Sequence, residues 1–266
     1  MQQARDFLDE SRSLDAIVGD LSDSDLQTVT QFNSWTIDDV LGHLHMFNVA
    51  ADVSLTDPGT LGDFLKPVFE AIGSGKSLID AQNLWLDGLS GEKLRDDWRA
   101  GYEKTAAAFA TADPKQRVEW AGPSMSARSS ITARQMETWA HGQEVFDILG
   151  HKRVDEDRIK NIAHLGVNTF GWTFVNRGES VPEPAPHVVL TGPSGAVWTF
   201  NEEQSDNKVS GSATEFCQVV TQARNVADTG IVTVGDTATR WMAIAQCFAG
   251  LPVEPPAPGS RHVVER

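Results

Sequence analysis

The chain of 266 residues is long enough for two compact domains, and its 40% hydrophobic content allows a buried core. Its net charge is −15, from 37 acidic against 22 basic residues, and Lys and Arg form no cluster. Binding to a phosphate backbone or an anionic membrane surface needs several positive contacts. We therefore expect neither nucleic acid nor a membrane as a partner, whereas the oligomeric state stays open.

The expected compartment follows from the cysteines and from the lack of long apolar runs. Cys217 and Cys247 are far apart, and each lies in an apolar periodic segment, which favours two buried thiols in a reducing compartment. No apolar run approaches the roughly 20 residues that span a bilayer. The charged stretch MQQARDFLDE does not resemble a signal peptide, so a cytoplasmic location is expected.

Helical periodicity dominates the first half of the chain. Thr36, with Asp39 three residues on, has the pattern of a capping box at a helix start, and Asp57-Pro58-Gly59 ends that helix. Gly150 is the stop of the last helix of this half. The helices are expected over 2–19, 36–56, 61–72, 77–89, 91–113 and 131–150, with a connector over 115–129. Long helices joined by modest loops indicate a bundle, and bundles build sites from facing helices.

After Gly150 the pattern changes to that of a mixed domain. A linking helix over 155–178 is followed by a Pro-rich break, and HVVLTGPSGAVWTFN predicts a hairpin around Gly-Pro-Ser-Gly. Residues 208–224 and 230–250 each predict a strand followed by a helix, and the tail from 251 is irregular. The predicted fold class is therefore α+β: a helical bundle over 1–152 and a smaller α+β domain over 153–266.

The stretch RQMETWAHGQEVFD contains the first candidate ligands. Glu137 and His141 stand four residues apart, so on a helix both side chains can reach one point. The segment GHLH adds His43 and His45, which point about 200° apart on a helix, so only one of them can join a shared site. Periodicity does not choose between them. Two histidines and one carboxylate form the ligand set of catalytic zinc sites, with a position left open.

Two motifs then resemble a known family. SWTIDDVLGHL resembles the N-terminal metal motif of the DinB-like, mycothiol-dependent maleylpyruvate isomerase family, and METWAHGQEVFDILG resembles its second motif. The resemblance implies His43, Glu137 and His141 as ligands of a divalent metal, expected to be zinc, and leaves His45 out. It departs at Glu144, where the family often has Asp, so the reach of that carboxylate differs.

The resemblance also implies a four-helix bundle and a low-molecular-weight thiol, mycothiol or a related compound, as cosubstrate. The segment from VSGSATEFCQVVTQAR onward resembles the C-terminal domain of one branch of the family, which is similar to an accessory domain of a wyosine-forming tRNA enzyme. A role in tRNA modification would follow from that similarity alone, and the charge of −15 argues against it.

Five further residues are candidates near such a site. Arg134 could bind a substrate carboxylate or form a surface ion pair, and Arg240, which opens the helix in TRWMAIAQ, could reach a cleft between domains or lie on a helix surface. Trp35 and Trp139 could form walls of the pocket or simply pack in the core, and Gln143 could donate a hydrogen bond to a ligand.

Three functions fit these residues. The first is a zinc-dependent thiol transferase or isomerase, in which a metal-activated thiol attacks a small electrophile. The second is a metal-dependent hydrolase, in which hydroxide replaces the thiolate on the same three ligands. The third is a metal-containing bundle that binds a ligand or partner without catalysis. Dependence of turnover on a thiol discriminates between the first two.

Overall fold

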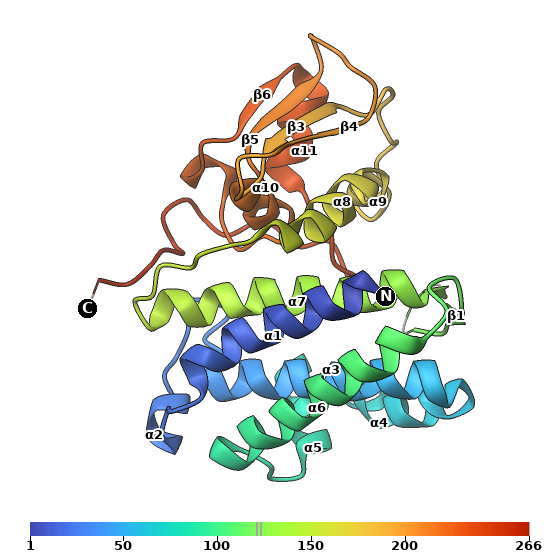
Figure 1. Cartoon of the computed structure of the whole chain (residues 1–266), viewed down its shortest axis with the longest axis vertical. Coiled ribbons are helices and arrows are strands. Elements are labelled where there is room, and N and C mark those ends of the chain that lie inside the picture. The colour runs from blue at the N-terminus through green and yellow to red at the C-terminus, as the bar shows by residue number, and fades with distance from the viewer. Residues whose placement is uncertain (121, 123, 266) are drawn as a thin grey trace. The chain divides into compact units, whose positions relative to one another are not determined.

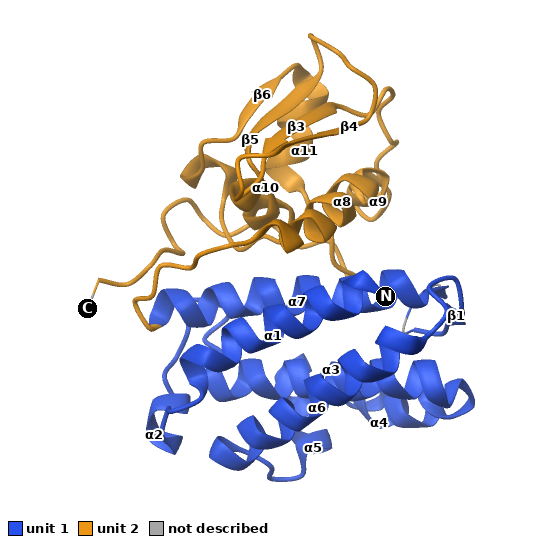
Figure 2. Ribbon diagram, viewed as in Figure 1, with its two compact units in different colours: residues 1–148 blue, residues 149–266 orange. Residues whose placement is uncertain are grey.

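The computed structural model describes residues 1–120, 122 and 124–265. The chain divides into two compact units, Met1–Ile148 and Leu149–Arg266, coloured separately in Figure 2. The division falls a few residues before the boundary suggested by the sequence. None of the helices in the described ranges combines the length and the apolar character needed to cross a membrane.

The first unit is built on four long helices that lie side by side in Figure 1: α1 (Gln2–Val18), α3 (Ile37–Thr56), α6 (Gly91–Thr111) and α7 (Ala127–Ile148). α1 packs against α6 and α7, and α3 packs against the same two helices. The predicted four-helix bundle is thereby confirmed. The shorter α4 (Leu61–Gly73) and α5 (Leu78–Leu86) pack on α3, and a single turn, α2 (Asp23–Leu26), was not predicted.

Burial in the bundle explains why the site lies where it does. Large apolar side chains such as Phe7, Leu41 and Trp98 fill the interior. α7 also buries many polar side chains, which are Ser130, Arg134, Gln135, Thr138, His141, Gln143, Glu144 and Asp147. Buried polar and charged groups are costly unless they are paired or bind a ligand. A bundle helix with so many of them indicates a functional interior rather than a plain core.

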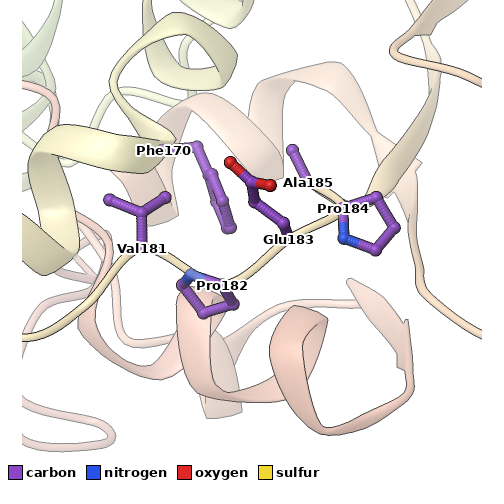
Figure 3. A pocket seen from close by; sticks show the side chains of 6 residues that line it. All are labelled: Phe170, Val181, Pro182, Glu183, Pro184 and Ala185. Atoms are coloured by element: carbon purple, nitrogen blue, oxygen red, sulfur yellow. The ribbon is translucent and has the colours of Figure 1, made fainter.

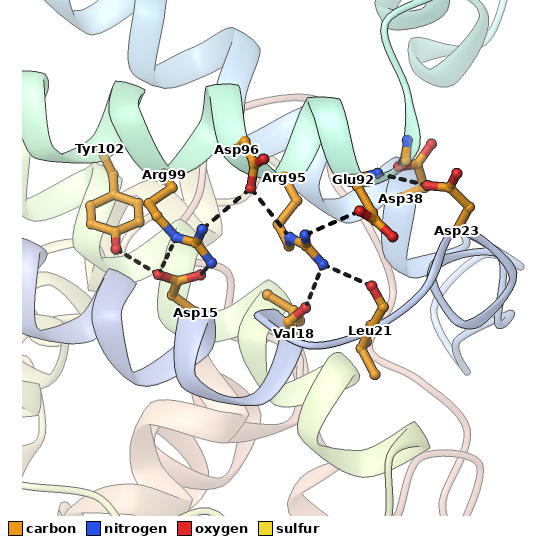
Figure 4. A network of polar contacts seen from close by, with 11 residues as sticks. Asp15, Val18, Leu21, Asp23, Asp38, Glu92, Arg95, Asp96, Arg99 and Tyr102 are labelled. Atoms are coloured by element: carbon orange, nitrogen blue, oxygen red, sulfur yellow. Dashed lines mark hydrogen bonds and ion pairs between the residues drawn. The ribbon is translucent and has the colours of Figure 1, made fainter.

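The amino end of α6 is capped from other parts of the chain (Figure 4). The Asp38 carboxylate accepts a hydrogen bond from the Gly91 amide at 2.8 Å, and Asp23 accepts one from the Glu92 amide at 2.8 Å. These bonds satisfy amides that have no partner within the helix. The bond to Asp38 also attaches α6 to the start of α3, which carries His43, and the bond to Asp23 attaches it to α2.

The middle of α6 is held to α1 by an ion pair. The Arg99 guanidinium donates to both carboxylate oxygens of Asp15 at 2.8 Å, and the Tyr102 hydroxyl donates to Asp15 at 3.0 Å (Figure 4). Arg95 donates to the Leu21 carbonyl at 2.7 Å. A bidentate guanidinium–carboxylate pair fixes the angle between its two helices as well as their distance.

In the connector between α6 and α7, of which residues 121 and 123 lie outside the described residues, β1 (Arg117–Val118) pairs with β2 (Met125–Ser126). α7 begins at Ala127, earlier than the expected start at residue 131. The hydroxyl of Ser126, just before α7, accepts a hydrogen bond from the Ser129 amide at 3.1 Å. Serine is a favoured residue at this position, which explains the earlier start.

The second unit contains one four-stranded sheet of order β4-β3-β5-β6, with β3 and β5 parallel and the other pairs antiparallel. The β3–β4 hairpin and both strand–helix repeats were predicted. The elements are η2 (Asp157–Ile159), α8 (Lys160–Asn168), α9 (Phe170–Val175), β3 (His187–Thr191), β4 (Val197–Phe200), β5 (Lys208–Ser212), α10 (Ala213–Val220), η3 (Val226–Asp228), β6 (Val232–Val234) and α11 (Asp236–Ile244).

Two details of the second unit bear on the sequence predictions. The expected single linking helix is broken at Thr169, whose hydroxyl donates to the Leu165 and Gly166 carbonyls and so competes with the helical pattern. Both cysteines are buried thiols, as predicted. The Pro-rich segment after α9 borders a hollow beside Phe170, in which Glu183 is the one charged lining side chain (Figure 3).

The cap on α6 gives a stability prediction. Gly91 has φ +65°, and a Cβ atom there would lie 2.2 Å from Asp23 Oδ1. We expect Gly91→Ala to lower the free energy of unfolding by about 1–3 kcal/mol, because it adds backbone strain and displaces the Asp23 cap. Chemical denaturation measures this. Gly62→Ala is the matched control, since its Cβ would meet nothing within 4 Å. Equal stability of the two variants would contradict the assigned role of the cap.

Candidate metal centre

Three side chains from two helices converge inside the bundle. His43 lies on α3, and Glu137 and His141 lie one turn apart on α7. Glu137 Oε2 is 3.6 Å from His43 Nε2 and 3.4 Å from His141 Nε2. One nitrogen or oxygen atom from each of the three residues lies within 4.8 Å of the others. Both histidines are buried, whereas the Glu137 side chain is 22% exposed, so the cluster is open on the carboxylate side.

The helix start sets the register of His43. The Thr36 side chain accepts from the Asp39 amide and the Asp39 carboxylate accepts from the Thr36 amide, which is the predicted capping box. His45, two residues further on, is half-buried on another side of α3, where its ring meets Trp85. Of the two histidines in GHLH, His43 alone joins Glu137 and His141.

The electrostatics of the cluster are set by burial and by the carboxylates. Burial, together with the nearby His141, lowers the pKa of His43 to about 4. Burial also opposes the charged form of His141, but Glu144 and Glu137 outweigh it and raise the pKa of His141 to about 9. The Glu137 pKa is held well below its usual value because His141 and His43 outweigh burial. At neutral pH, His43 is therefore neutral and His141 carries a proton.

Glu144 orients the second histidine. His141 Nδ1 lies 3.3 Å from Glu144 Oε2, in the position to donate a hydrogen bond, which leaves Nε2 facing Glu137. Metal-binding histidines commonly donate their other ring nitrogen to a carboxylate in this way. The longer side chain of Glu144, where the family often has Asp, still reaches the imidazole.

Aromatic rings surround the two histidines. The Trp35 ring stacks on His141 with centroids 5.5 Å apart and lies 5.3 Å from His43. Phe32 meets His141 edge-on at 5.2 Å, and Phe47 packs on His43 at 4.7 Å. These contacts restrict the tilt of both imidazoles and exclude water from their faces. The sequence pointed to Trp35 and, by helical spacing, placed Phe47 in the same row of its helix as His43, but it gave no signal for Phe32.

A tight turn presents two of these rings. Asn33 and Ser34 both have positive φ, 48° and 59°, and the Trp35 amide donates to the Phe32 carbonyl at 2.8 Å. Two central residues with positive φ are typical of the type I′ turns of hairpins. The turn places Phe32 and Trp35 on the same imidazole. Because non-glycine residues adopt positive φ only at a cost, the surrounding bonds must hold the turn in place.

Arg134 lies one turn before Glu137 and is 3% exposed, so it is not a surface residue. Its guanidinium lies over the Phe47 ring, and its Nε donates to Asn48 Oδ1 on α3 at 3.3 Å. Burial lowers the pKa of Arg134, and the Glu137 charge, which raises that pKa, offsets only part of the effect. Asn48 was not singled out from the sequence.

The other sequence candidates lie elsewhere. Trp139 is fully buried in the core. The Gln143 amide donates to Asp147 at 2.9 Å rather than to a ligand of the cluster. Arg240 belongs to the second unit, where it pairs with Glu179 at 2.7 Å.

The donor set fits a divalent metal. Two imidazole nitrogens and one carboxylate oxygen match the three-ligand sites that keep a position open for a further ligand. The Glu144 contact supplies the outer support that such histidines commonly have. The fold and the cluster together define a DinB-like helical bundle with a candidate three-residue metal centre.

Comparisons with known proteins agree with this description. The profile of a family described as the mycothiol maleylpyruvate isomerase N-terminal domain matches residues 7–146. An uncharacterized protein of Mycobacterium tuberculosis, found in strains CDC 1551 and H37Rv, is 35% identical over 247 residues, which cover 93% of this chain and 95% of the relative. The chain therefore belongs to the mycothiol maleylpyruvate isomerase family.

Solved structures extend the similarity to both units. The crystal structure of a mycothiol-dependent maleylpyruvate isomerase covers 96% of this chain and 95% of its own, with a TM-score of 0.54 at 15% identity. A mutant of that isomerase gives a TM-score of 0.55 with the same coverage. At this identity the similarity establishes a shared fold.

The charge states give a pH prediction. A metal must displace the His141 proton, while His43 is already neutral. Apparent zinc affinity should therefore rise about tenfold per pH unit between pH 6.5 and 8.5, below the His141 pKa, because one proton is released per metal. Competition with a chelator of known affinity measures this.

Glu144→Gln is the informative control for this titration. It removes the carboxylate that raises the His141 pKa, so the rise in affinity should flatten at a lower pH. A zinc affinity that does not change with pH in the wild-type protein would contradict the assigned protonation state.

Proposed function

We propose that this protein is a metal-dependent thiol isomerase or transferase, in which a low-molecular-weight thiol attacks a small electrophile. The convergence of His43, Glu137 and His141 carries the proposal. Membership of the mycothiol maleylpyruvate isomerase family supports mycothiol or a related thiol as the cosubstrate. We take zinc as the metal, since two imidazoles and a carboxylate are a common zinc ligand set.

Charge balance in the cluster favours an anionic sulfur. Without metal, protonated His141 and Arg134 balance Glu137 and Glu144. If a dication took the place of the His141 proton, the buried site would carry one net positive charge. A bound divalent metal would supply the Lewis acidity that lowers the pKa of a thiol. One thiolate restores neutrality, and the thiolate is the reactive nucleophile.

The protein's own residues would orient the reactants. Glu144 fixes the His141 ring through Nδ1, and Trp35 and Phe32 restrict its tilt. The partly exposed Glu137 marks the side from which small molecules approach. Phe32, Trp35 and Phe47 are each half-buried, so they form an apolar rim that separates the sulfur from bulk water. A less hydrated thiolate is a stronger nucleophile.

The chemistry would be a reversible addition. The thiolate sulfur forms a bond to one carbon of a conjugated double bond, and the π electrons move onto the conjugated carbonyl oxygen. The former double bond is now single and rotates. Return of the electron pair expels the thiolate and regenerates the double bond in the other geometry, so no thiol is consumed. With a leaving group in place of the double bond, the same attack transfers the sulfur permanently.

The decisive test is turnover in the presence and absence of thiol. Zinc-loaded protein should isomerise maleylpyruvate with mycothiol, or conjugate a panel of small electrophiles, and should be inactive without thiol. His43→Ala should lose this turnover. His45→Ala is the matched control and should retain it, because His45 lies outside the cluster. Glu144→Gln should reduce turnover about 10- to 100-fold, as loss of an outer hydrogen bond does in other metal sites.

Two results would contradict the proposal. Thiol-independent hydrolysis by the loaded protein would indicate the hydrolase that uses the same ligands. Folded, zinc-loaded protein without turnover of any thiol–electrophile pair would indicate a metal-containing binding protein.

A further inference from the structure

Asn48 and Arg134 form a buried pair with unused hydrogen-bond donors. Asn48 is 0% exposed and Arg134 is 3% exposed. Arg134 Nε donates to Asn48 Oδ1 at 3.3 Å, so the two side chains meet between α3 and α7. Among the described residues, neither Arg134 Nη2 nor Asn48 Nδ2 has a hydrogen-bond acceptor. Buried donors without acceptors are rare in folded proteins and call for an explanation.

These donors lie beside the metal centre. Arg134 is one turn before Glu137 on α7, and its charge is felt by both Glu137 and His43. The Phe47 ring links the two places, since it lies against the Arg134 guanidinium at 5.6 Å and against the His43 ring at 4.7 Å. A ligand that satisfies the pair would therefore have its remaining atoms close to the candidate metal ligands.

Stabilisation of the fold is a weaker explanation of the pair. The two histidines that face Glu137 lower its pKa more than the Arg134 charge does, so neutralisation of Glu137 accounts for only part of the role of Arg134. A guanidinium placed only for charge balance would not require a neighbouring amide with an open N–H. The unused atoms are both donors, so the missing group is an acceptor.

The donors select the chemistry of that group. A planar guanidinium next to an amide N–H suits the two oxygens of a carboxylate. A single negative charge matches the one net positive charge that the metal-loaded cluster would carry before thiol binds. A dianionic phosphate would add an uncompensated charge near Glu137 and Glu144, which disfavours it.

We propose that Arg134 and Asn48 bind a carboxylate of the electrophile and thereby restrict the substrate to carboxylic acids whose reactive carbon reaches the metal centre. The substrate assignment rests on the proposed function, whereas the binding of a carboxylate by the pair does not. Arg134 supplies the charge. The Oδ1 atom of Asn48 accepts a hydrogen bond from the guanidinium Nε, and the Nδ2 atom of Asn48 is a further donor for the carboxylate.

The test is binding without turnover. The full-length, zinc-loaded protein is titrated with crotonate, an unsaturated acid, and with crotonamide, its uncharged analogue, by ligand-observed NMR in the absence of thiol. We expect crotonate to bind at least tenfold more tightly than crotonamide. Asn48→Asp and Arg134→Met should each weaken crotonate binding at least tenfold while retaining zinc. Lys93→Gln, which removes an exposed cation on α6, is the control and should change nothing.

The outcomes separate the pair from other sites. Unchanged crotonate binding in zinc-loaded Asn48→Asp would place the carboxylate elsewhere and overturn the proposal, even if Arg134→Met fails to fold. Equal binding of acid and amide, or no binding of crotonate at millimolar concentration, would also overturn it. Selective binding of the acid in a protein without thiol-dependent turnover would sustain the pair and contradict only the proposed function.

Discussion

The contact of the partly buried Glu137 carboxylate with His43 and His141 is the one on which the site depends. A carboxylate in the interior of a bundle is costly unless it is paired, and here two imidazoles and the nearby Arg134 offset that cost. Because His43 comes from α3 and Glu137 from α7, the same contact sets the spacing of the two helices. The polar interior of α7 is tolerable in this arrangement, which gives the cluster a fixed geometry and a donor set that fits a cation.

The aromatic rings and the α6 cap support that contact from outside. Trp35 and Phe32, presented by a tight turn, hold the His141 ring on one side, while Glu144 holds its Nδ1. Asp23 and Asp38 cap the amino end of α6. Because Asp38 lies at the start of α3, this cap joins the helix that carries His43 to α6. In the function that we propose, the position of the three side chains would select the cation, and the aromatic rim would favour a small, partly apolar reactant.

The sequence predicted the long helices well because their start signals are local. The capping box of Thr36 with Asp39 is present as expected. The sequence could not choose His43 over His45 as the metal ligand, because α3 is buried on nearly all sides and its hydrophobic pattern has no clear face. Only the family resemblance made that choice.

The Asn48–Arg134 pair and the position of Phe32 depend on how separate segments pack, and local sequence patterns do not contain that information.

One measurement tests the central claim most directly: the zinc content of protein purified without a chelating column and dialysed against zinc. The account predicts about one zinc per wild-type chain and per His45→Ala chain, and none in Glu137→Ala or His43→Ala. A folded wild-type protein that takes up no zinc, or variants that retain it, would contradict the account.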